Sequence, residues 1–352
     1  MSTIGGILQK ESKHWVGQQS SNCTHASQMW YLFKVMSFIL ILGTTHGAFR
    51  SRRSVNPEAN MNISQIISYW GYPGEVHDVV TEDGYILGLY RIPYGKANND
   101  NSAQKLVVYL QHGLLTSGSS WVSNLPNNSL GFILADAGYD VWLGNSRGTT
   151  WSRKHLYLKT NSKEFWAFSF DEMAKYDLPA SIDFIVKHTG QKEIFYVGHS
   201  QGTTIAFITF STIPKIAEKV KIFFALAPVF SIKYSNSPLI KMAYKWKSVI
   251  KLFNSSRLRA FDWGSPVLNW MHFNQTTSPF YNVTCMNVST STWNGARDVL
   301  ADPQDVNNLL SEITNHIYHK TISSYNHIDF LFGLDVYHQV YREIIDIIQG
   351  TL

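Results

Sequence analysis

Short apolar runs alternate with longer amphipathic segments along most of the chain. The first two runs flank Glu82-Asp83-Gly84 within residues 76–93, a pattern typical of a β-hairpin. Later runs predict strands, and the segments of helical periodicity between them predict helices. Strands are expected at residues 105–110, 139–143, 194–197, 221–226, just before 294 and 317–322, and helices at 130–137, 169–188, 201–210 and in the segment that ends before Gly350.

The longest of these predicted helices carries signals at both of its ends. Ser169 and Glu172 fit a capping box at its start, and Gly190 is placed to end it. Strands that alternate with helices indicate an α/β fold, in which helices cover both faces of a mostly parallel sheet.

Composition narrows the class of protein. The 352 residues suit one large α/β domain or two modest ones, and a hydrophobic content of 44 % excludes a disordered chain. No apolar run approaches eighteen residues, which excludes a protein with several membrane spans. The net charge is only +5, with scattered Lys and Arg, so we expect no nucleic-acid partner. Two cysteines cannot form a disulfide framework or a four-thiolate zinc site, and Cys285 is expected to be a small buried side chain.

The N-terminal region has the pattern of a secretory signal peptide. Residues 30–42 are apolar except for Lys34 and Ser37, and small and polar residues follow up to Gly47. We expect residues 1–47 to form a leader that is cleaved near Gly47, and an uncleaved anchor on a membrane-bound esterase is the alternative. Export as a glycoprotein is also favoured by six N-x-S/T sequons, at Asn62, Asn127, Asn254, Asn274, Asn282 and Asn287.

A candidate nucleophile lies between a predicted strand and a predicted helix. Residues 198–202 read Gly-His-Ser-Gln-Gly, which is the G-x-S-x-G pattern of a nucleophile elbow centred on Ser200. At the start of the helix, the backbone N–H of Gln201 is a candidate donor to an oxyanion. Leu114 is the second candidate donor, because it follows the strand at 105–110 in the sequence His112-Gly113-Leu114-Leu115, where His112 is expected to shape the loop.

A serine nucleophile needs a base and a group that orients the base, and the usual order in this fold is Ser, acid, His. Asp298 follows the strand that ends near Asn294, and His327 follows the next predicted strand. Because the carboxyl ends of parallel strands meet at one edge of the sheet, we expect both side chains to reach Ser200.

Other residues compete for these two roles. Asp302 and Asp305 flank Pro303 at a predicted helix start, where capping explains them better than catalysis does. Asp329 lies too close in sequence to the proposed base for easy alignment of its imidazole. His316 and His319 lie within a predicted strand and are expected to be structural.

These motifs resemble the acid lipase family, which includes gastric and lysosomal acid lipases. The resemblance covers most of the chain after Asn56, in blocks such as LQHGLL, GYDVWLGNSRG, FWAFSFDEMAKYDLPA, YVGHSQGTT, WNGARD and YNHIDF. It implies an α/β-hydrolase fold and a secreted or lysosomal glycoprotein that hydrolyses neutral lipid esters, either triacylglycerols or cholesteryl esters. We expect a monomer that meets a lipid droplet or membrane surface transiently. No metal or organic cofactor is needed for this chemistry. The resemblance places nucleophile, acid, base and oxyanion donors on the five residues proposed above: Ser200, Asp298, His327, Leu114 and Gln201.

The sequence departs from this family at the cap over the active site. Only 32 residues, 230–261, stand where the family has a much longer helical cap. We therefore expect a core formed by residues 48–229 and 262–352 with a truncated cap between its two parts. The segment KMAYKWKSVIKLF (241–253) is suited either to a lipid surface or to a short lid helix. The alternative function is a catalytically impaired lipid-binding protein or a splice form that folds poorly.

Overall fold

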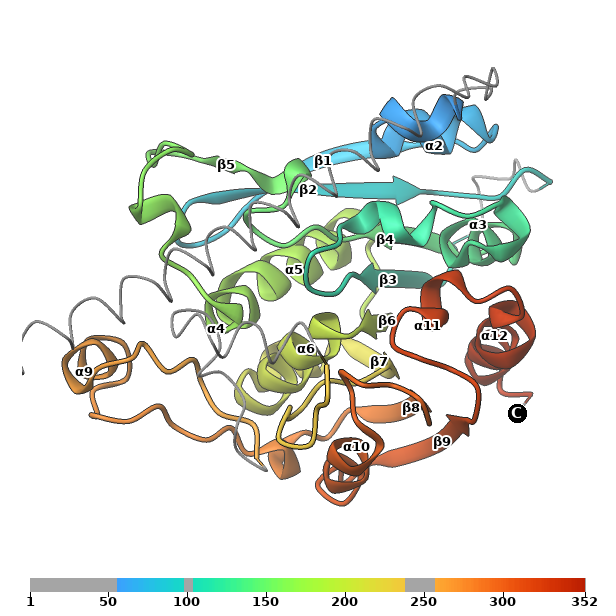
Figure 1. Cartoon of the computed structure of the whole chain (residues 1–352). Helices are drawn as coiled ribbons and strands as arrows, with labels where there is room; N and C mark the ends of the chain where they lie inside the picture. Colours follow the sequence, from blue (N-terminus) through green and yellow to red (C-terminus); the bar gives the residue numbers. More distant parts are fainter. Residues whose placement is uncertain (1–55, 98–103, 238–256, 352) are drawn as a thin grey trace, which may run out of the picture. The chain divides into compact units, whose positions relative to one another are not determined.

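A nine-stranded sheet forms the centre of the unit that spans Asn60–Leu352 (Figure 1). The computed structural model describes residues 56–97, 104–237 and 257–351. The predicted leader, the segment 241–253 and the sequon at Asn254 lie outside these ranges.

The strands follow the order β1-β2-β4-β3-β6-β7-β8-β9, and β5 pairs with β2. Antiparallel pairing joins β2 to β1, β4 and β5, whereas the other pairs are parallel. The mostly parallel sheet and the first hairpin are therefore as predicted. The strands are β1 (Glu75–Val80), β2 (Tyr85–Ile92), β3 (Val107–Gln111), β4 (Asp140–Leu143), β5 (Lys154–His155), β6 (Ile194–His199), β7 (Val220–Leu226), β8 (Ser289–Gly295) and β9 (His316–Ile322).

Helices cover both faces of the sheet, and each face has its own apolar core (Figure 1). Along β3, Val108 and Leu110 pack into the core that contains α2, α3, α11 and α12, whereas Val107 and Tyr109 pack into the core that contains α4, α5 and α6. This alternation follows from the two-residue period of a strand buried on both faces. The helices are α2 (Ile63–Tyr69), α3 (Leu130–Asp136), α4 (Phe170–Glu172), α5 (Leu178–Thr189), α6 (Gln201–Thr212), α7 (Pro214–Ala217), α9 (Pro266–Phe273), α10 (Pro303–Leu310), α11 (Asp329–Phe332) and α12 (Arg342–Gln349).

Among the described helices, none combines the length and the apolar character that crossing a lipid bilayer requires.

The predicted helix at 169–188 is present but interrupted. Its capping box on Ser169 and Glu172 and its left-handed end at Gly190 are both confirmed. Between them, Met173–Asp177 forms a π-helical turn, η7, which separates α4 from α5. Pro179 lies just after this turn and has no N–H to donate back along the helix. The turn therefore widens, which periodicity alone does not predict.

The expectation that Cys285 is buried is wrong. Cys285 is exposed, and it lies in a single 3-10 turn, η8 (Val283–Cys285). The tight turn directs its neighbours Val283 and Met286 into the protein instead. The Cys285 thiol accepts a hydrogen bond of 3.2 Å from Asn282 Nδ2.

Candidate active site

Ser200 lies at the sharp turn between β6 and α6. Its backbone has φ 55° and ψ −120°, a strained conformation for a residue with a side chain. The two glycines of the motif allow this turn to pack tightly. A Cβ on Gly202 would lie 2.5 Å from the carbonyl oxygen of Gln111, and one on Gly198 would lie 2.8 Å from the carbonyl oxygen of Gly202. The strand, turn and helix expected around Ser200 are therefore all present.

A chain of hydrogen bonds joins the three candidate residues of the triad. His327 Nε2 lies 2.7 Å from Ser200 Oγ, and His327 Nδ1 lies 2.8 Å from Asp298 Oδ2. His327, Ser200 and Asp298 are 6 %, 8 % and 2 % exposed, respectively. An imidazole that is bonded to a carboxylate on one side and to a hydroxyl on the other is placed to accept the hydroxyl proton.

The carboxyl ends of β8 and β9 position the acid and the base. Asp298 follows β8, and two backbone N–H groups hold its Oδ1 atom, from Leu300 at 2.8 Å and from Ala301 at 2.9 Å. Its Oδ2 atom is thereby directed toward the imidazole. Arg297 donates its backbone N–H to the carbonyl oxygen of Tyr325, which ties the loop of the acid to the loop of the base.

The competing residues have other partners. Asp302 caps α10 by accepting the N–H of Gln304, as expected. Each of the other two carboxylates also accepts a backbone N–H, Asp305 from Tyr234 and Asp329 from Asn326. The two rival histidines lie in β9 and both contact the hydroxyl of Thr292, at 2.9 Å for His316 and 2.8 Å for His319.

The loop after β3 approaches Ser200 closely. A Cβ on Gly113 would lie 2.8 Å from the Cβ of Ser200, so Leu114 begins next to the serine. Within the described ranges, neither the Leu114 N–H nor the Gln201 N–H donates to another group of the chain. Two free N–H groups beside a serine hydroxyl are what an oxyanion hole requires.

His112 shapes this loop from the inside, as the sequence predicts. Its Nδ1 atom donates to the carbonyl oxygen of Gly113 at 2.7 Å, and its Nε2 atom accepts the N–H of Ser146 at 3.1 Å. Burial lowers the pKa of His112 to about 4. The ring is therefore neutral, which its acceptor role at Nε2 requires.

His199, which precedes the serine, contacts the loop of the base, and the sequence does not predict this contact. Its Nε2 atom donates to the backbone carbonyl oxygen of His327 at 2.9 Å. Burial lowers the pKa of His199 to about 3, so this ring is neutral too. His199 thus links the turn that carries Ser200 to the loop that carries the base. The only available signal is its place in the motif, at a position where the pattern accepts any residue.

Comparisons with known proteins identify the family. The sequence matches the model of a partial α/β-hydrolase lipase region over residues 63–125 and that of the α/β hydrolase fold over residues 107–254. It is 63 % identical to lipase member J of Homo sapiens, in a match that covers 83 % of this chain and 100 % of that protein. The chain belongs to the acid lipase family of α/β-hydrolases.

Two further relatives belong to the same group. The chain is 50 % identical to gastric triacylglycerol lipase of Homo sapiens, over 91 % of this chain and 99 % of that protein. It is 45 % identical to lysosomal acid lipase/cholesteryl ester hydrolase of Macaca fascicularis, over 88 % and 96 %. Among solved structures, the Pyrococcus furiosus esterase Pf2001 matches with a TM-score of 0.52 and 16 % identity, over 81 % of this chain and 95 % of that one. The predicted α/β-hydrolase fold is confirmed.

In this acid lipase family member, a cavity of about 640 Å³ lies beside Ser200. This volume falls in the usual range for small-molecule sites. Leu114 and Gln201 line it together with serine and threonine residues, and its apolar wall is formed by Leu115, Trp166, Phe168, Met173 and Phe332. The cavity can therefore hold an apolar chain next to the two N–H groups.

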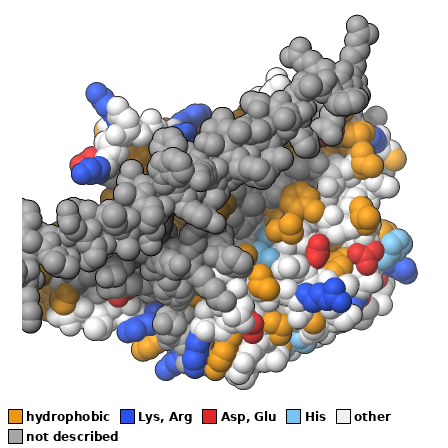
Figure 2. Space-filling model, in the orientation of Figure 1, with side chains coloured by type: hydrophobic (Ala, Val, Ile, Leu, Met, Phe, Trp, Pro, Cys, Tyr) orange, Lys and Arg blue, Asp and Glu red, His pale blue; other side chains and the backbone are white. Residues whose placement is uncertain are grey.

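A second, larger cavity of about 800 Å³ lies between α3 and the C-terminal helices. It shares Phe332 with the first cavity, but only the first is lined by the candidate oxyanion donors Leu114 and Gln201, so the smaller cavity is the better candidate for substrate. On the part of the surface visible in Figure 2, hydrophobic side chains form several separate groups among polar ones. These groups do not join into one continuous apolar patch on the visible surface.

Proposed function

We propose that the chain is a carboxylic ester hydrolase that cleaves neutral lipid esters, such as triacylglycerols, through an acyl-enzyme on Ser200. The observation that carries this proposal is the hydrogen-bonded series Ser200, His327 and Asp298 at a strained turn, with distances of 2.7 and 2.8 Å. The relatives are lipases by name, which supports the same reaction.

The reaction follows from the roles that the geometry allows. His327 accepts the proton of Ser200 as the hydroxyl oxygen attacks the ester carbonyl, and the N–H groups of Leu114 and Gln201 stabilise the resulting oxyanion. His327 then protonates the departing alcohol and activates a water that releases the acid, while Asp298 keeps the imidazole in position. Loss of one oxyanion donor typically lowers kcat by about 10²–10³-fold.

The buried cation of the cavity is already neutralised by the chain itself. Arg147 lines the cavity but is buried, and two carboxylates neutralise it, Asp83 at 2.6 Å and Asp177 at 2.7 Å. The same guanidinium lies 4.0 Å from the ring centre of Tyr85. A cation held in this way is not free to bind the carboxylate or phosphate of a charged lipid. The other cation of the lining, Arg153, is exposed and lies 5.7 Å from the ring centre of Trp166.

The shortened cap is expected to change which esters are cleaved. The match with lipase member J has 366 aligned positions, whereas 83 % of this 352-residue chain is about 292 residues, so roughly 74 residues of that relative have no counterpart. This difference supports a truncated cap at residues 230–261. Since apolar walls hold long acyl chains, we propose that long-chain esters lose more activity than short-chain esters do.

We propose that the protein is a secreted or lysosomal monomer that meets a lipid droplet or membrane surface transiently. The names of the gastric and lysosomal relatives support the secretory pathway. Asn62 caps α2 with its side chain and is half-buried, which makes it the least accessible of the described sequons. The other four described sequons have exposed asparagines, which suits glycosylation: Asn127, Asn274, Asn282 and Asn287.

The test combines covalent labelling with substrate profiling. A fluorophosphonate probe should label Ser200 in the full-length protein, and short- and long-chain p-nitrophenyl esters should be hydrolysed across a range of pH. The Ser200→Ala variant should lose both signals and keep its Tm. A folded wild-type protein that is neither labelled nor active would instead indicate a lipid-binding protein with an unused triad.

A further inference from the structure

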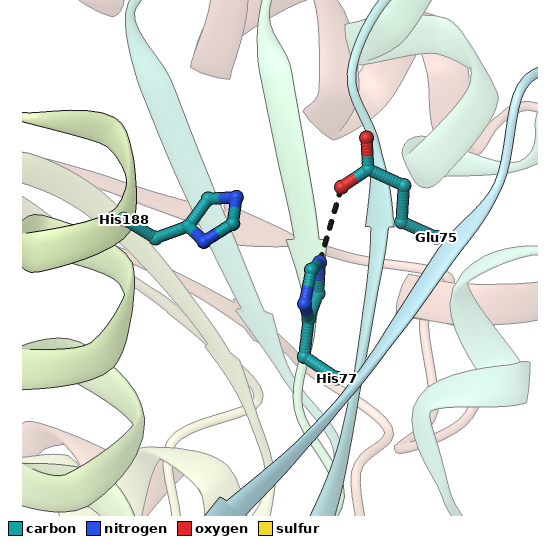
Figure 3. A group of neighbouring side chains, drawn as sticks. All are labelled: Glu75, His77 and His188. Atoms are coloured by element: carbon teal, nitrogen blue, oxygen red, sulfur yellow. Dashed lines mark hydrogen bonds and ion pairs between the residues drawn. The ribbon is translucent and has the colours of Figure 1, made fainter.

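Three potential metal ligands converge on one side of the sheet, away from the serine. Glu75 and His77 lie on β1, and their side chains share one face because they are two residues apart. His188 projects toward them from the last turn of α5 (Figure 3). One donor atom from each residue can be chosen so that all three lie within 4.8 Å of one another. No other such group is found in the described ranges.

This cluster lies at the β1 edge of the sheet, four strands away from β6, which leads to Ser200. Glu75 is the first residue of β1 and pairs with Arg91, which pairs with Trp142, the third of the four residues of β4; β3 lies between β4 and β6. Ser200 follows the last residue of β6, which runs in the same direction as β4. The proposed hydrolysis therefore makes no use of the cluster.

The local charges favour a bound cation. Arg91 is the nearest opposing charge, with its Nη1 atom 3.1 Å from Glu75 Oε2. Asp140 accepts hydrogen bonds from the other two nitrogens of the Arg91 guanidinium, from Nε at 2.8 Å and from Nη2 at 2.9 Å. The carboxylates of Glu75 and Asp140 therefore carry two negative charges against one positive charge. His188 also lies in the last turn of α5, where the helix dipole adds partial negative charge.

We propose that Glu75, His77 and His188 form a binding site for Zn²⁺ that ties the end of α5 to the edge strand β1. Two imidazoles and one carboxylate are ligands that Zn²⁺ prefers, and a water would complete the tetrahedron. Ca²⁺ and Mg²⁺ prefer oxygen ligands and fit this set poorly.

The geometry requires only small movements. Bonds of about 2.0–2.1 Å to a tetrahedral Zn²⁺ place neighbouring donor atoms roughly 3.3 Å apart. His77 Nε2 and Glu75 Oε2 are already 3.0 Å apart, joined by the hydrogen bond in Figure 3. Zn²⁺ takes the place of the hydrogen between these two atoms, and the neutral ring of His77, bound through Nε2, carries its one proton on Nδ1 instead. His188 is exposed, and its ring, which packs against Phe184 and Trp142, must turn to cover the remaining distance.

The test measures Zn²⁺ binding to the full-length protein after metal has been removed with a chelator. Competition with a chromophoric chelator and elemental analysis should show one Zn²⁺ per chain, Tm should rise by a few degrees with micromolar Zn²⁺, and Mg²⁺ should have neither effect. His188→Gln and His77→Gln should each weaken binding at least about tenfold, since even indirect ligand losses reach that size. The matched control is His338→Gln, which removes an exposed histidine outside the cluster.

Two outcomes would overturn the site: a wild-type protein that takes up no Zn²⁺ at micromolar concentration, or a His188→Gln variant that binds as tightly as wild type. His188 is on the surface, so its variant stays informative even if His77→Gln does not fold. Ester hydrolysis should be the same in His188→Gln and wild type.

Discussion

Replacing Asp298 by Asn tests the proposed orientation of the imidazole. The Oδ1 atom of Asp298 accepts two backbone N–H groups, and its Oδ2 atom accepts from His327 Nδ1. In the Asp298→Asn variant the amide oxygen must stay at the first position, because an NH₂ group there would leave three buried donors facing one another, at about 1–3 kcal/mol for each unpaired group. The NH₂ group of the new amide therefore faces His327 and donates to Nδ1.

This donation reverses the tautomer of the imidazole. With Nδ1 as an acceptor, the proton of His327 sits on Nε2, 2.7 Å from the Ser200 oxygen, so the ring cannot accept the serine proton. The analogous change in the well-studied serine protease triad lowers kcat by about 10⁴-fold, or roughly 5.5 kcal/mol of barrier. We expect a loss of this size in Asp298→Asn. Its stability should change little, because the same atoms remain hydrogen-bonded.

The assay is kcat/KM on a short-chain p-nitrophenyl ester, with the rate of fluorophosphonate labelling as a second readout and Tm as the measure of folding. Asp302→Asn is the matched control, since Asn caps a helix as well as Asp does and this residue lies at the start of α10. If Asp298→Asn keeps activity within tenfold of wild type while folded, the proposed role of this carboxylate is wrong.

Two further changes follow from the packing of the site. Gly202→Ala should destabilise the fold by about 1–3 kcal/mol and lower kcat through displacement of the oxyanion loop, because the new Cβ would lie 2.5 Å from the Gln111 carbonyl oxygen. Gly190→Ala is the control for kcat: its positive φ of 70° costs stability as well, but its Cβ meets no atom within 4 Å, so kcat should stay unchanged. Burial raises the pKa of Asp171 to about 6 although Tyr281 and Phe261 donate hydrogen bonds to it, so the folded chain binds this proton more tightly than the unfolded chain does. Stability should therefore fall as pH rises from about 4 to 6, by up to about 3 kcal/mol, and urea denaturation of Asp171→Asn should lack this part of the pH dependence; a difference between wild type and variant that is constant with pH would contradict the assignment.

Elements with a local signal could be predicted from the sequence. β6 and α6 flank a motif of two glycines and a serine, and the capping box on Ser169 and Glu172 marks the start of α4 through contacts between residues three apart. The two-residue strand β5 and the π-helical turn η7 could not be predicted, because the first depends on pairing with β2 and the second on a proline that disturbs a periodic pattern. The exposure of Cys285 depends likewise on the direction of one tight turn.

The residues of the candidate site likewise divide into those with a signal in the sequence and those without one. Chain order and strand ends single out Ser200, Asp298 and His327, and capping removes Asp302 without any structure. The contact of His199 with the backbone of His327 joins residues far apart in sequence, so no local sequence pattern predicts it. The cluster of Glu75, His77 and His188 could not be predicted from the sequence either, because it depends on the packing of α5 against β1.

The two proposed sites lie on different strands of one sheet, and this separation makes the two proposals independent. At the carboxyl ends of the parallel strands, loops are free to carry polar groups toward one point, and the serine, the acid and the base converge there. At the edge of the sheet, β1 brings Glu75 and His77 next to the end of α5, where a cation would hold the edge strand in place. An edge strand has an unpaired side and opens more readily than a central one, so a metal there acts on stability. Because the sites share no side chain, loss of Zn²⁺ binding should change Tm without changing kcat, and loss of the triad should do the reverse.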